Sequence, residues 1–471
     1  MYANHDLLAN RFKYLQTFNI AMHRLLTWVH FSLEPNPGSL AAMILHSRGL
    51  IFNKLKKTLW DSSLKRSQRA STTLDLILNR PKAMRQRASS VVDEEARSAL
   101  FTQAFRQLNA AENYHFRRSD NVYYVKFLGE NAEDAGGPYR ETFCQYSCEL
   151  QSSQLPLLLR TPNAAHNVGA FREKWVLNPG AFGSQSRLRR RLFEFLGKIM
   201  GAIVRSRDYI ALDLALVMWK WLVHEPLQVS DLESMDRMLV QSMAKIRTID
   251  SLGVTEEMFE DIVLETFTTL STDNRMVEIK PNGKSIPVTF ATRCEFADLV
   301  EHFRLHEFDQ VLRYVELGLG KVLPLQYLHL FTANEFEKMV CGSPEVSISL
   351  LQQCTEYSSC AATDQHIVWF WATLNAFSHQ ERSAFLRFVW GRSRLPNSVA
   401  EFPQWFKLQS FSKTPADSYL PVAHTCFFAL ELPPYSSQEL LSKKLLYAIY
   451  NCQEIDADGD SVAANQLGWE E

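Results

Sequence analysis

Apolar residues recur at helical spacing over most of the chain, and this spacing predicts a mainly helical protein. The first such stretch runs from Phe12 to Phe31 and is followed by the turn Pro35–Gly38. A second begins at Leu40 and continues towards Trp60. Further apolar helices are expected near residues 188–205 and 208–224, and helices resume between 296 and 354.

Only short stretches have the composition of strands. Val122 to Leu128 is rich in β-branched and aromatic residues, and the paired glycines at 136–137 predict a turn before a helix that begins near Pro138. Residues 276–279 and 286–290 flank an Asn-Gly turn, which predicts a hairpin. The region of about 225–300 is therefore expected to form a small subdomain inserted in the helical body.

The last part of the chain has a different pattern. Residues 355–364 are polar and small and have no apolar period, so we expect a flexible link there. Helices are expected at 365–377 and 380–389, then a strand that starts just after Cys426 and a helix that continues to Ile449. Together these elements have the size of one compact unit.

The composition is that of a globular protein. Of the 471 residues, 46% are hydrophobic and 22% are charged, and the net charge is −2. This near-neutral charge gives no reason to expect nucleic acid as a partner, and no apolar run reaches the roughly 18 residues of a membrane span. The eight cysteines are scattered, which favours a reducing compartment, the cytoplasm or the nucleus.

Two segments depart from this balance. Ten basic and two acidic residues lie between Lys54 and Arg87, and six acidic residues and no basic ones follow Asn451. We interpret the first as a solvated helical face with a linker and the second as an acidic tail.

Common catalytic signatures are absent from the sequence. There is no GxSxG, HExxH or Walker A motif, and the pairs Cys144/Cys148 and Cys354/Cys360 lack a partner pair at zinc-ligand spacing. We therefore expect no metal and no cofactor.

Cys426 is the strongest candidate for chemistry. It stands where a loop enters a strand, beside the polar residues His424 and Thr425. The thiolate is the reacting form of cysteine, and polar neighbours can stabilise it, so Cys426 is a candidate nucleophile. On the residue pattern alone, a buried packing role is the alternative.

Several separated motifs resemble, in the same order, those of the HECT family of ubiquitin-protein ligases. They are Val125–Glu130, Asp134–Glu141, Asn178-Pro179, Phe195–Gly201, Phe331–Glu337, Val340–Gly342, Trp369–Trp371, Arg392–Pro396 and Leu420–Tyr435. The likeness extends from about Leu74 to Ile449. The residues around Cys426 and at 447–452 are most similar to the large HERC branch of that family.

The resemblance implies an α+β, mainly helical fold with two lobes. A large helical N lobe would span 74–354 and include a small carrier-binding subdomain at about 225–300. An interlobe linker at 355–364 would lead to a smaller α/β C lobe at 365–452. Residues 1–73 would form an N-terminal helical extension with a basic linker, and 453–471 the acidic tail.

The resemblance also implies a reaction. Ubiquitin would pass from a ubiquitin-conjugating enzyme to Cys426 as a thioester and then to a lysine of a protein substrate. Thioester exchange is nearly balanced in energy, so it requires positioning and partial thiolate rather than a strong base. His424 and Thr425 are expected to assist the thiol or the developing oxyanion, and Arg394 to contact the tail of ubiquitin.

Docking of the ubiquitin-conjugating enzyme requires exposed apolar and aromatic anchors on the small subdomain. The residues that qualify by position and type are Met243, Ile246, Phe259, Leu264 and Phe267. For each of them, packing in the core is the alternative role.

Two other functions fit parts of the sequence. A cysteine hydrolase acting on ubiquitin conjugates would also use Cys426, although it normally needs a histidine held by Asp or Asn. A non-catalytic helical scaffold would need no nucleophile. Because the matched region begins near residue 74, we expect the chain to be a catalytic fragment or a short isoform of a larger ligase.

Overall fold

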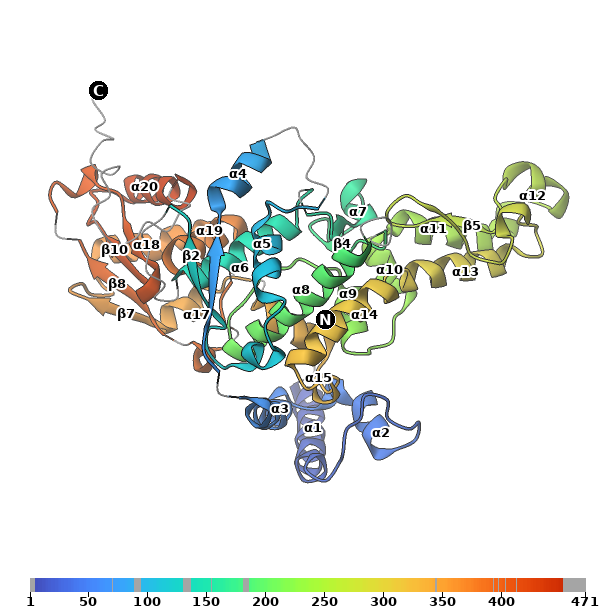
Figure 1. Ribbon diagram of the computed structural model, residues 1–471, viewed down its shortest axis with the longest axis horizontal. Coiled ribbons are helices and arrows are strands. Elements are labelled where there is room, and N and C mark those ends of the chain that lie inside the picture. The colour runs from blue at the N-terminus through green and yellow to red at the C-terminus, as the bar shows by residue number, and fades with distance from the viewer. Residues whose placement is uncertain are drawn as a thin grey trace.

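The structure is a computed structural model. It describes residues 5–69, 71–88, 95–129, 137–153, 155–180, 186–343, 345–392, 394–396, 398–402, 404–411 and 413–451. Over these residues the fold is mainly helical with small sheets, which confirms the expected α+β class (Figure 1). No helix in the described ranges is both long and apolar enough to cross a membrane.

The buried side chains form three separate clusters, and we name the three parts of the chain after them. The large core contains residues from Met22 to Cys341, the small core residues from Met243 to Val300, and the C-terminal core residues from Val346 to Ile449. The small and C-terminal units lie at opposite ends of the molecule, and the N-terminal helices lie against the large unit between them (Figure 1).

The large unit begins with the N-terminal helices and continues through the central helical body. Its elements are α1 (His5–Leu26), α2 (Leu40–His46), η1 (Arg48–Leu50), α3 (Asn53–Ser67), β1 (Leu74–Leu78), α4 (Arg80–Ala88), α5 (Leu100–Leu108), η2 (Asn113–Arg117), β2 (Tyr123–Phe127), α6 (Gly137–Leu150), β3 (Leu158–Arg160), α7 (Pro162–Ala165), β4 (Trp175–Leu177), α8 (Ser186–Ser206), α9 (Leu216–Leu222), α10 (Val229–Met235), α14 (Asp309–Val322), α15 (Leu325–Leu328) and α16 (Ala333–Cys341).

The two other units are smaller. The small unit consists of α11 (Arg237–Arg247), η3 (Ile249–Leu252), α12 (Glu256–Ile262), β5 (Thr268–Leu270), β6 (Met276–Glu278), η4 (Gly283–Ser285) and α13 (Arg293–His306). The C-terminal unit consists of α17 (Ile348–Gln353), β7 (Thr355–Ser358), α18 (Gln365–Ala376), α19 (His379–Trp390), η5 (Val399–Glu401), β8 (Phe406–Ser410), η6 (Ala416–Ser418), β9 (Val422–His424), η7 (Thr425–Phe427), β10 (Ala429–Leu432) and α20 (Gln438–Asn451).

The backbones of α8 and α14 approach closely at the centre of the large unit. A Cβ atom at Gly197 would lie 2.0 Å from the carbonyl oxygen of Val315, and one at Gly318 would lie 1.9 Å from the carbonyl oxygen of Glu194. Glycine inside a helix costs about 1 kcal/mol relative to alanine. At these two positions that cost is offset by the close packing of the two helices, which no larger residue permits.

The N-terminal helices share the large core instead of forming a separate extension. The Trp60 ring meets the Phe331 ring edge-on, with centroids 5.6 Å apart. Lys56, whose side chain is 1% exposed, forms an ion pair of 2.6 Å with Glu335. The solvated face expected for the basic stretch is therefore wrong at Lys56, because a carboxylate from α16 pairs with its ammonium group inside the interface.

The expected N-terminal helices are present, but the second is interrupted. The first is confirmed as α1, whereas the stretch from Leu40 to Trp60 divides into α2, η1 and α3. The division falls at Arg48, which is buried and donates to the carbonyls of Val223 and His329. The α-helix is interrupted there, and the guanidinium group reaches these carbonyls in the large unit.

The helix expected over 208–224 is wrong in its first half. Residues 208–215 are not helical, and helix α9 begins only at Leu216. The Ile210 amide donates to the Val340 carbonyl at 3.1 Å, and the Trp175 amide donates to the Asp213 carbonyl at 2.8 Å. Apolar periodicity does not separate a buried extended segment from a helix, and here hydrogen bonds to neighbouring segments replace the helical ones.

The hairpin expected between 276–279 and 286–290 is also wrong. Strand β6 pairs antiparallel with β5, which precedes it in the chain. At the expected turn, Gly283 packs so tightly that a Cβ atom would lie 2.2 Å from the Phe267 carbonyl oxygen. Pro287 has no N–H group to donate to a second strand.

The C-terminal unit contains a four-stranded sheet in the order β7-β8-β10-β9. Strand β8 is parallel to β7 and β10, and β9 is antiparallel to β10. The irregular link expected over 355–364 is wrong at Thr355–Ser358, which form β7, because a β-branched and an aromatic residue there favour a strand. The C-terminal core begins upstream of that link, at Val346.

The contact between α8 and α14 generates a prediction. Replacing Gly318 with alanine should lower the free energy of unfolding by about 2–3 kcal/mol, because the added methyl group meets backbone that cannot move aside. Urea unfolding followed by circular dichroism measures this change. Gly320→Ala on the same helix is the matched control, since its Cβ would meet only the flexible Leu325 side chain at 3.0 Å. Equal unfolding midpoints for the two variants would contradict the tight crossing.

Candidate active site

Cys426 is the middle residue of the 3-10 helix η7, which connects β9 to β10. These two strands are antiparallel, and His424 lies opposite Ala429. The strand expected just after Cys426 is confirmed as β10, which begins at Ala429. The candidate nucleophile therefore belongs to a tight connection between two paired strands.

The residue that follows this turn is held by the C-terminal core. Phe428 has φ 47° and ψ 53°, the left-handed conformation, which costs a non-glycine residue about 1–2 kcal/mol. Its ring is fully buried and stacks on the Trp390 ring, with centroids 4.0 Å apart and planes 7° from parallel. Burial of this aromatic pair offsets the backbone cost and fixes the path of the chain beside Cys426.

The two polar neighbours of Cys426 have different surroundings. Nε2 of His424 lies 3.1 Å from Oε1 of Glu431 on β10. Thr425 is buried, and its carbonyl accepts the Phe428 amide at 3.4 Å. The sequence interpretation missed Glu431. Glu431 could have been found from its position in β10, because β10 pairs with β9, the strand that contains His424.

Arg394 lies at the interface between the C-terminal and large units. Its Nη2 is 2.6 Å from Oδ1 of Asp213, and its side chain is 9% exposed. Arg392 forms a second ion pair, of 2.5 Å, with Asp208, and both of these side chains are buried. Burial lowers the pKa of Arg392 and Asp208 opposes that shift. The two arginines thus join the C-terminal unit to the segment 208–215 of the large unit.

Three of the five expected carrier anchors are not on the surface. Met243, Phe259 and Phe267 belong to the small core, and the last two have no exposed area. For these three residues the prediction of exposed anchors is wrong and the core alternative is confirmed, because a unit this small needs its largest apolar side chains for its own core. Ile246 is partly buried against that core, whereas Leu264 is 84% exposed.

Leu264 borders a shallow cleft of about 290 Å³ lined by Glu260, Val263, Leu264, Glu265, Thr266, Pro287 and Val288. Three other exposed apolar residues precede it closely in the chain. Met258 and Ile262 are 49% and 52% exposed, and Leu252 is 69% exposed. The sequence interpretation missed these three residues. The i, i+4 spacing of Met258 and Ile262 in the acidic helix α12 is the signal that could have identified them.

The other thiols differ in their access to reagents. All six cysteines whose side chains the structure describes are free. Cys341 is buried, and burial raises its pKa to about 12. Cys148 and Cys294 are exposed, so they are the natural controls for any assay of thiol reactivity.

Comparison with known proteins assigns the chain to a family. A family model described as HECT-domain (ubiquitin-transferase) matches residues 147–457, and the chain belongs to this family. It is 35% identical over 384 residues to the E3 ubiquitin-protein ligase HERC2 of Mus musculus, an alignment that covers 81% of the chain and 8% of that relative.

Two further relatives show the same pattern. The chain is 38% identical over 339 residues to HERC2 of Homo sapiens, covering 72% of the chain and 7% of the relative. It is 28% identical over 366 residues to the E3 ubiquitin-protein ligase HUWE1 of Mus musculus, covering 76% of the chain and 8% of the relative. The chain thus spans less than a tenth of the length of each of these relatives.

The ion pairs of Arg392 and Arg394 generate a second prediction. Leaving a buried charge without its partner costs about 3–5 kcal/mol, so Asp208→Ala should cause the C-terminal unit to leave the large unit and expose Arg392 to water. Small-angle X-ray scattering should then show a larger radius of gyration. Asp61→Ala is the control, because Asp61 pairs with Arg207 at 4.0 Å on the exposed surface. An unchanged radius in Asp208→Ala would refute this role for the ion pair.

Proposed function

We propose that the chain is a ubiquitin-protein ligase that carries ubiquitin as a thioester on Cys426. The observation that carries the proposal is the position of Cys426 on the η7 turn, inside the region matched by the ubiquitin-transferase family. In the first step, the Cys426 thiolate attacks the carbonyl carbon of the carrier's ubiquitin thioester. A new C–S bond forms, the old one breaks, and the carrier leaves as its thiolate.

The second step transfers ubiquitin to the substrate. A neutral lysine amine attacks the carbonyl carbon of the Cys426 thioester, a C–N bond forms, and Cys426 leaves as thiolate while the amine loses its proton to solvent. The thioester supplies the driving force for the amide bond. The protein's task is therefore to position the reacting groups in both steps.

Two neighbours of Cys426 are proposed as supporting residues. His424 orients the turn through its contact with Glu431, and Thr425 shapes the turn from its buried position. Arg394 reaches the ubiquitin tail only after it separates from Asp213. Its contact with ubiquitin would therefore belong to a state in which the C-terminal unit has moved.

We further propose a two-lobed arrangement in which the C-terminal unit reorients between the two steps, since each step has a different partner. The large and small units correspond to the N lobe, and the C-terminal unit to the C lobe. A pivot between Cys341 and Val346 leaves the four-stranded sheet intact, whereas one at 359–364 requires β7 to separate from β8. Gly342, with φ 73°, supports a pivot between Cys341 and Val346, because glycine adopts backbone conformations that other residues rarely do.

The ubiquitin-conjugating enzyme is proposed to dock on the exposed apolar surface of the small unit. Leu264 and the residues Leu252, Met258 and Ile262 supply the apolar area, and the adjoining cleft can accept a projecting side chain. The substrate would be a protein with an accessible lysine. The free cysteines support a reducing compartment, the cytoplasm or the nucleus.

The hydrolase and scaffold alternatives have less support. His424 does face an acidic partner, but that partner is a glutamate on the neighbouring strand, and membership of a ubiquitin-transferase family favours transfer over hydrolysis. Incubating the chain with activating enzyme, carrier and ubiquitin separates the three functions. A thiol-sensitive adduct indicates a ligase, cleavage of ubiquitin conjugates a hydrolase, and neither outcome a scaffold.

The proposed nucleophile leads to a third prediction. Cys426→Ala should form no ubiquitin adduct, and Cys426→Ser should form an oxygen ester that resists dithiothreitol, because only the sulfur ester exchanges readily with thiols. Gel electrophoresis with and without reductant measures both. Cys148→Ala and Cys294→Ala should behave like the parent chain. A reducible adduct on Cys426→Ala would show that another thiol accepts ubiquitin.

The proposed docking surface leads to a fourth prediction. Leu264→Ala should weaken binding of the best-charging carrier about tenfold, because truncation of a central apolar anchor costs about 1–2 kcal/mol. Fluorescence anisotropy with labelled carrier gives the Kd. Leu317→Ala, at an exposed leucine of α14, should bind normally. Equal affinities for these two variants would place the docking surface elsewhere.

A further inference from the structure

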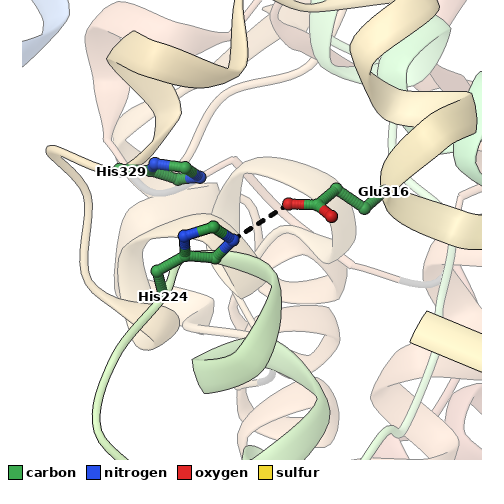
Figure 2. Close-up of side chains that lie close together, drawn as sticks. All are labelled: His224, Glu316 and His329. Carbon is green, nitrogen blue, oxygen red and sulfur yellow. Dashed lines mark hydrogen bonds and ion pairs between the residues drawn. The ribbon is translucent and has the colours of Figure 1, made fainter. Parts of the chain in front are cut away.

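Three side chains from separate parts of the large unit converge at one point. His224 follows α9, Glu316 lies on α14, and His329 follows α15 (Figure 2). The two imidazole rings stack with centroids 4.0 Å apart, and Nε2 of His224 is 2.9 Å from Oε1 of Glu316. One nitrogen from each histidine and one carboxylate oxygen lie within 4.8 Å of one another.

His329 has an unsatisfied nitrogen at this point. Its side chain is 2% exposed, and no described residue forms a hydrogen bond with Nε2. An unsatisfied buried polar group costs about 1–3 kcal/mol. The ring thus has a buried nitrogen with no hydrogen-bond partner among the described residues.

The backbone around the two histidines is held by Arg48. Its guanidinium donates to the carbonyl of His329 at 2.8 Å and to that of His224 at 2.7 Å. It therefore faces the peptide carbonyls, and Glu225 lies 3.8 Å from its Nε. His224 adopts the left-handed conformation, with φ 54°. A strained residue kept in place by a buried arginine is typical of a site where geometry matters.

We propose that His224, Glu316 and His329 bind a zinc ion, with the fourth position open to water. Two imidazole nitrogens and one carboxylate oxygen are a donor set that zinc accepts, and Mg²⁺ and Ca²⁺ prefer all-oxygen sets. Bonds of about 2.1 Å place tetrahedral ligands about 3.4 Å apart. To bind one ion, the two stacked rings must rotate so that one nitrogen of each points at it. His224 is 44% exposed, so the ion has a path from solvent.

A zinc ion at this place would join three segments of the large unit that are distant in sequence. It would connect the ends of α9 and α15 to α14, and through Arg48 the same backbone is tied to the N-terminal helices. Zinc would also satisfy Nε2 of His329. This proposal departs from the sequence-based expectation of no metal. That expectation rested on known motifs, and residues 224, 316 and 329 form no such motif.

The test uses the full chain after treatment with chelator and titration with Co²⁺, a spectroscopic substitute for zinc. We expect one equivalent to give the visible absorption of a tetrahedral cobalt site, and Zn²⁺ to displace it. Replacing a residue that only supports a ligand typically weakens metal binding 10–100-fold. His224→Gln and Glu316→Gln, both partly exposed, should therefore bind about 100-fold more weakly or worse while keeping the parent's circular dichroism.

The matched control is His302→Gln. His302 and His306 form another imidazole pair, with centroids 4.5 Å apart, on α13, and this variant should titrate like the parent. Zn²⁺ should also raise the thermal midpoint of the parent chain but not that of Glu316→Gln. The proposal is overturned if His224→Gln and Glu316→Gln titrate like the parent, if only His302→Gln loses binding, or if a thiolate-to-cobalt charge-transfer band assigns the ion to cysteines.

Discussion

The close crossing of α8 and α14 is the constraint on which the arrangement of the other parts depends. Gly197 and Gly318 allow the two backbones to touch, so the ends of the two helices have fixed positions. At the end of α8, Arg205 donates to the carbonyl of Leu64 in α3 at 3.0 Å, and to that of Val322 at 2.9 Å. One arginine therefore connects both central helices to the N-terminal part of the chain.

The same crossing of α8 and α14 also fixes where the C-terminal unit contacts the large unit. The segment 208–215 follows α8, and Asp208 and Asp213 in this segment form ion pairs with Arg392 and Arg394. Buried ion pairs add less to stability than to specificity, because desolvation offsets much of their attraction. These ion pairs favour one docked orientation of the C-terminal unit. An interface held by ion pairs suits the reorientation that we propose for the C-terminal unit.

Much of the fold could be predicted because its elements have strong local signals. The period of α8, the capping box of α19, and the alternation of Phe428, Leu430 and Leu432 each indicate one structure. The incorrect predictions fall where contacts with segments distant in the sequence determine the local structure. Residues 208–215 have the apolar content of a buried helix, but their backbone forms hydrogen bonds with Val340 and Trp175 instead. Likewise, residues 355–358 form a strand by pairing with β8.

In the candidate site, too, local features could be predicted from the sequence and contacts across the fold could not. Cys426 could be proposed as the nucleophile from its neighbours and from the resemblance, because the residues that suggest this role are contiguous with it in the chain. Glu431, the partners of Arg394, and the trio of His224, Glu316 and His329 involve contacts across the fold, which spacing does not reveal. Burial in the small unit was likewise not predictable from residue type. Phe267 and Leu264 are both apolar and three positions apart, yet one is buried and the other is 84% exposed.

The central claim is that ubiquitin passes through this chain as a covalent intermediate. A single-turnover time course with labelled, carrier-bound ubiquitin and excess lysine substrate tests it most directly. The account predicts that a reducible adduct of the chain rises as the carrier thioester falls, and then decays at the rate at which the amide product appears. Product that forms as fast as the carrier thioester disappears, with no adduct of the chain at any time, would contradict it.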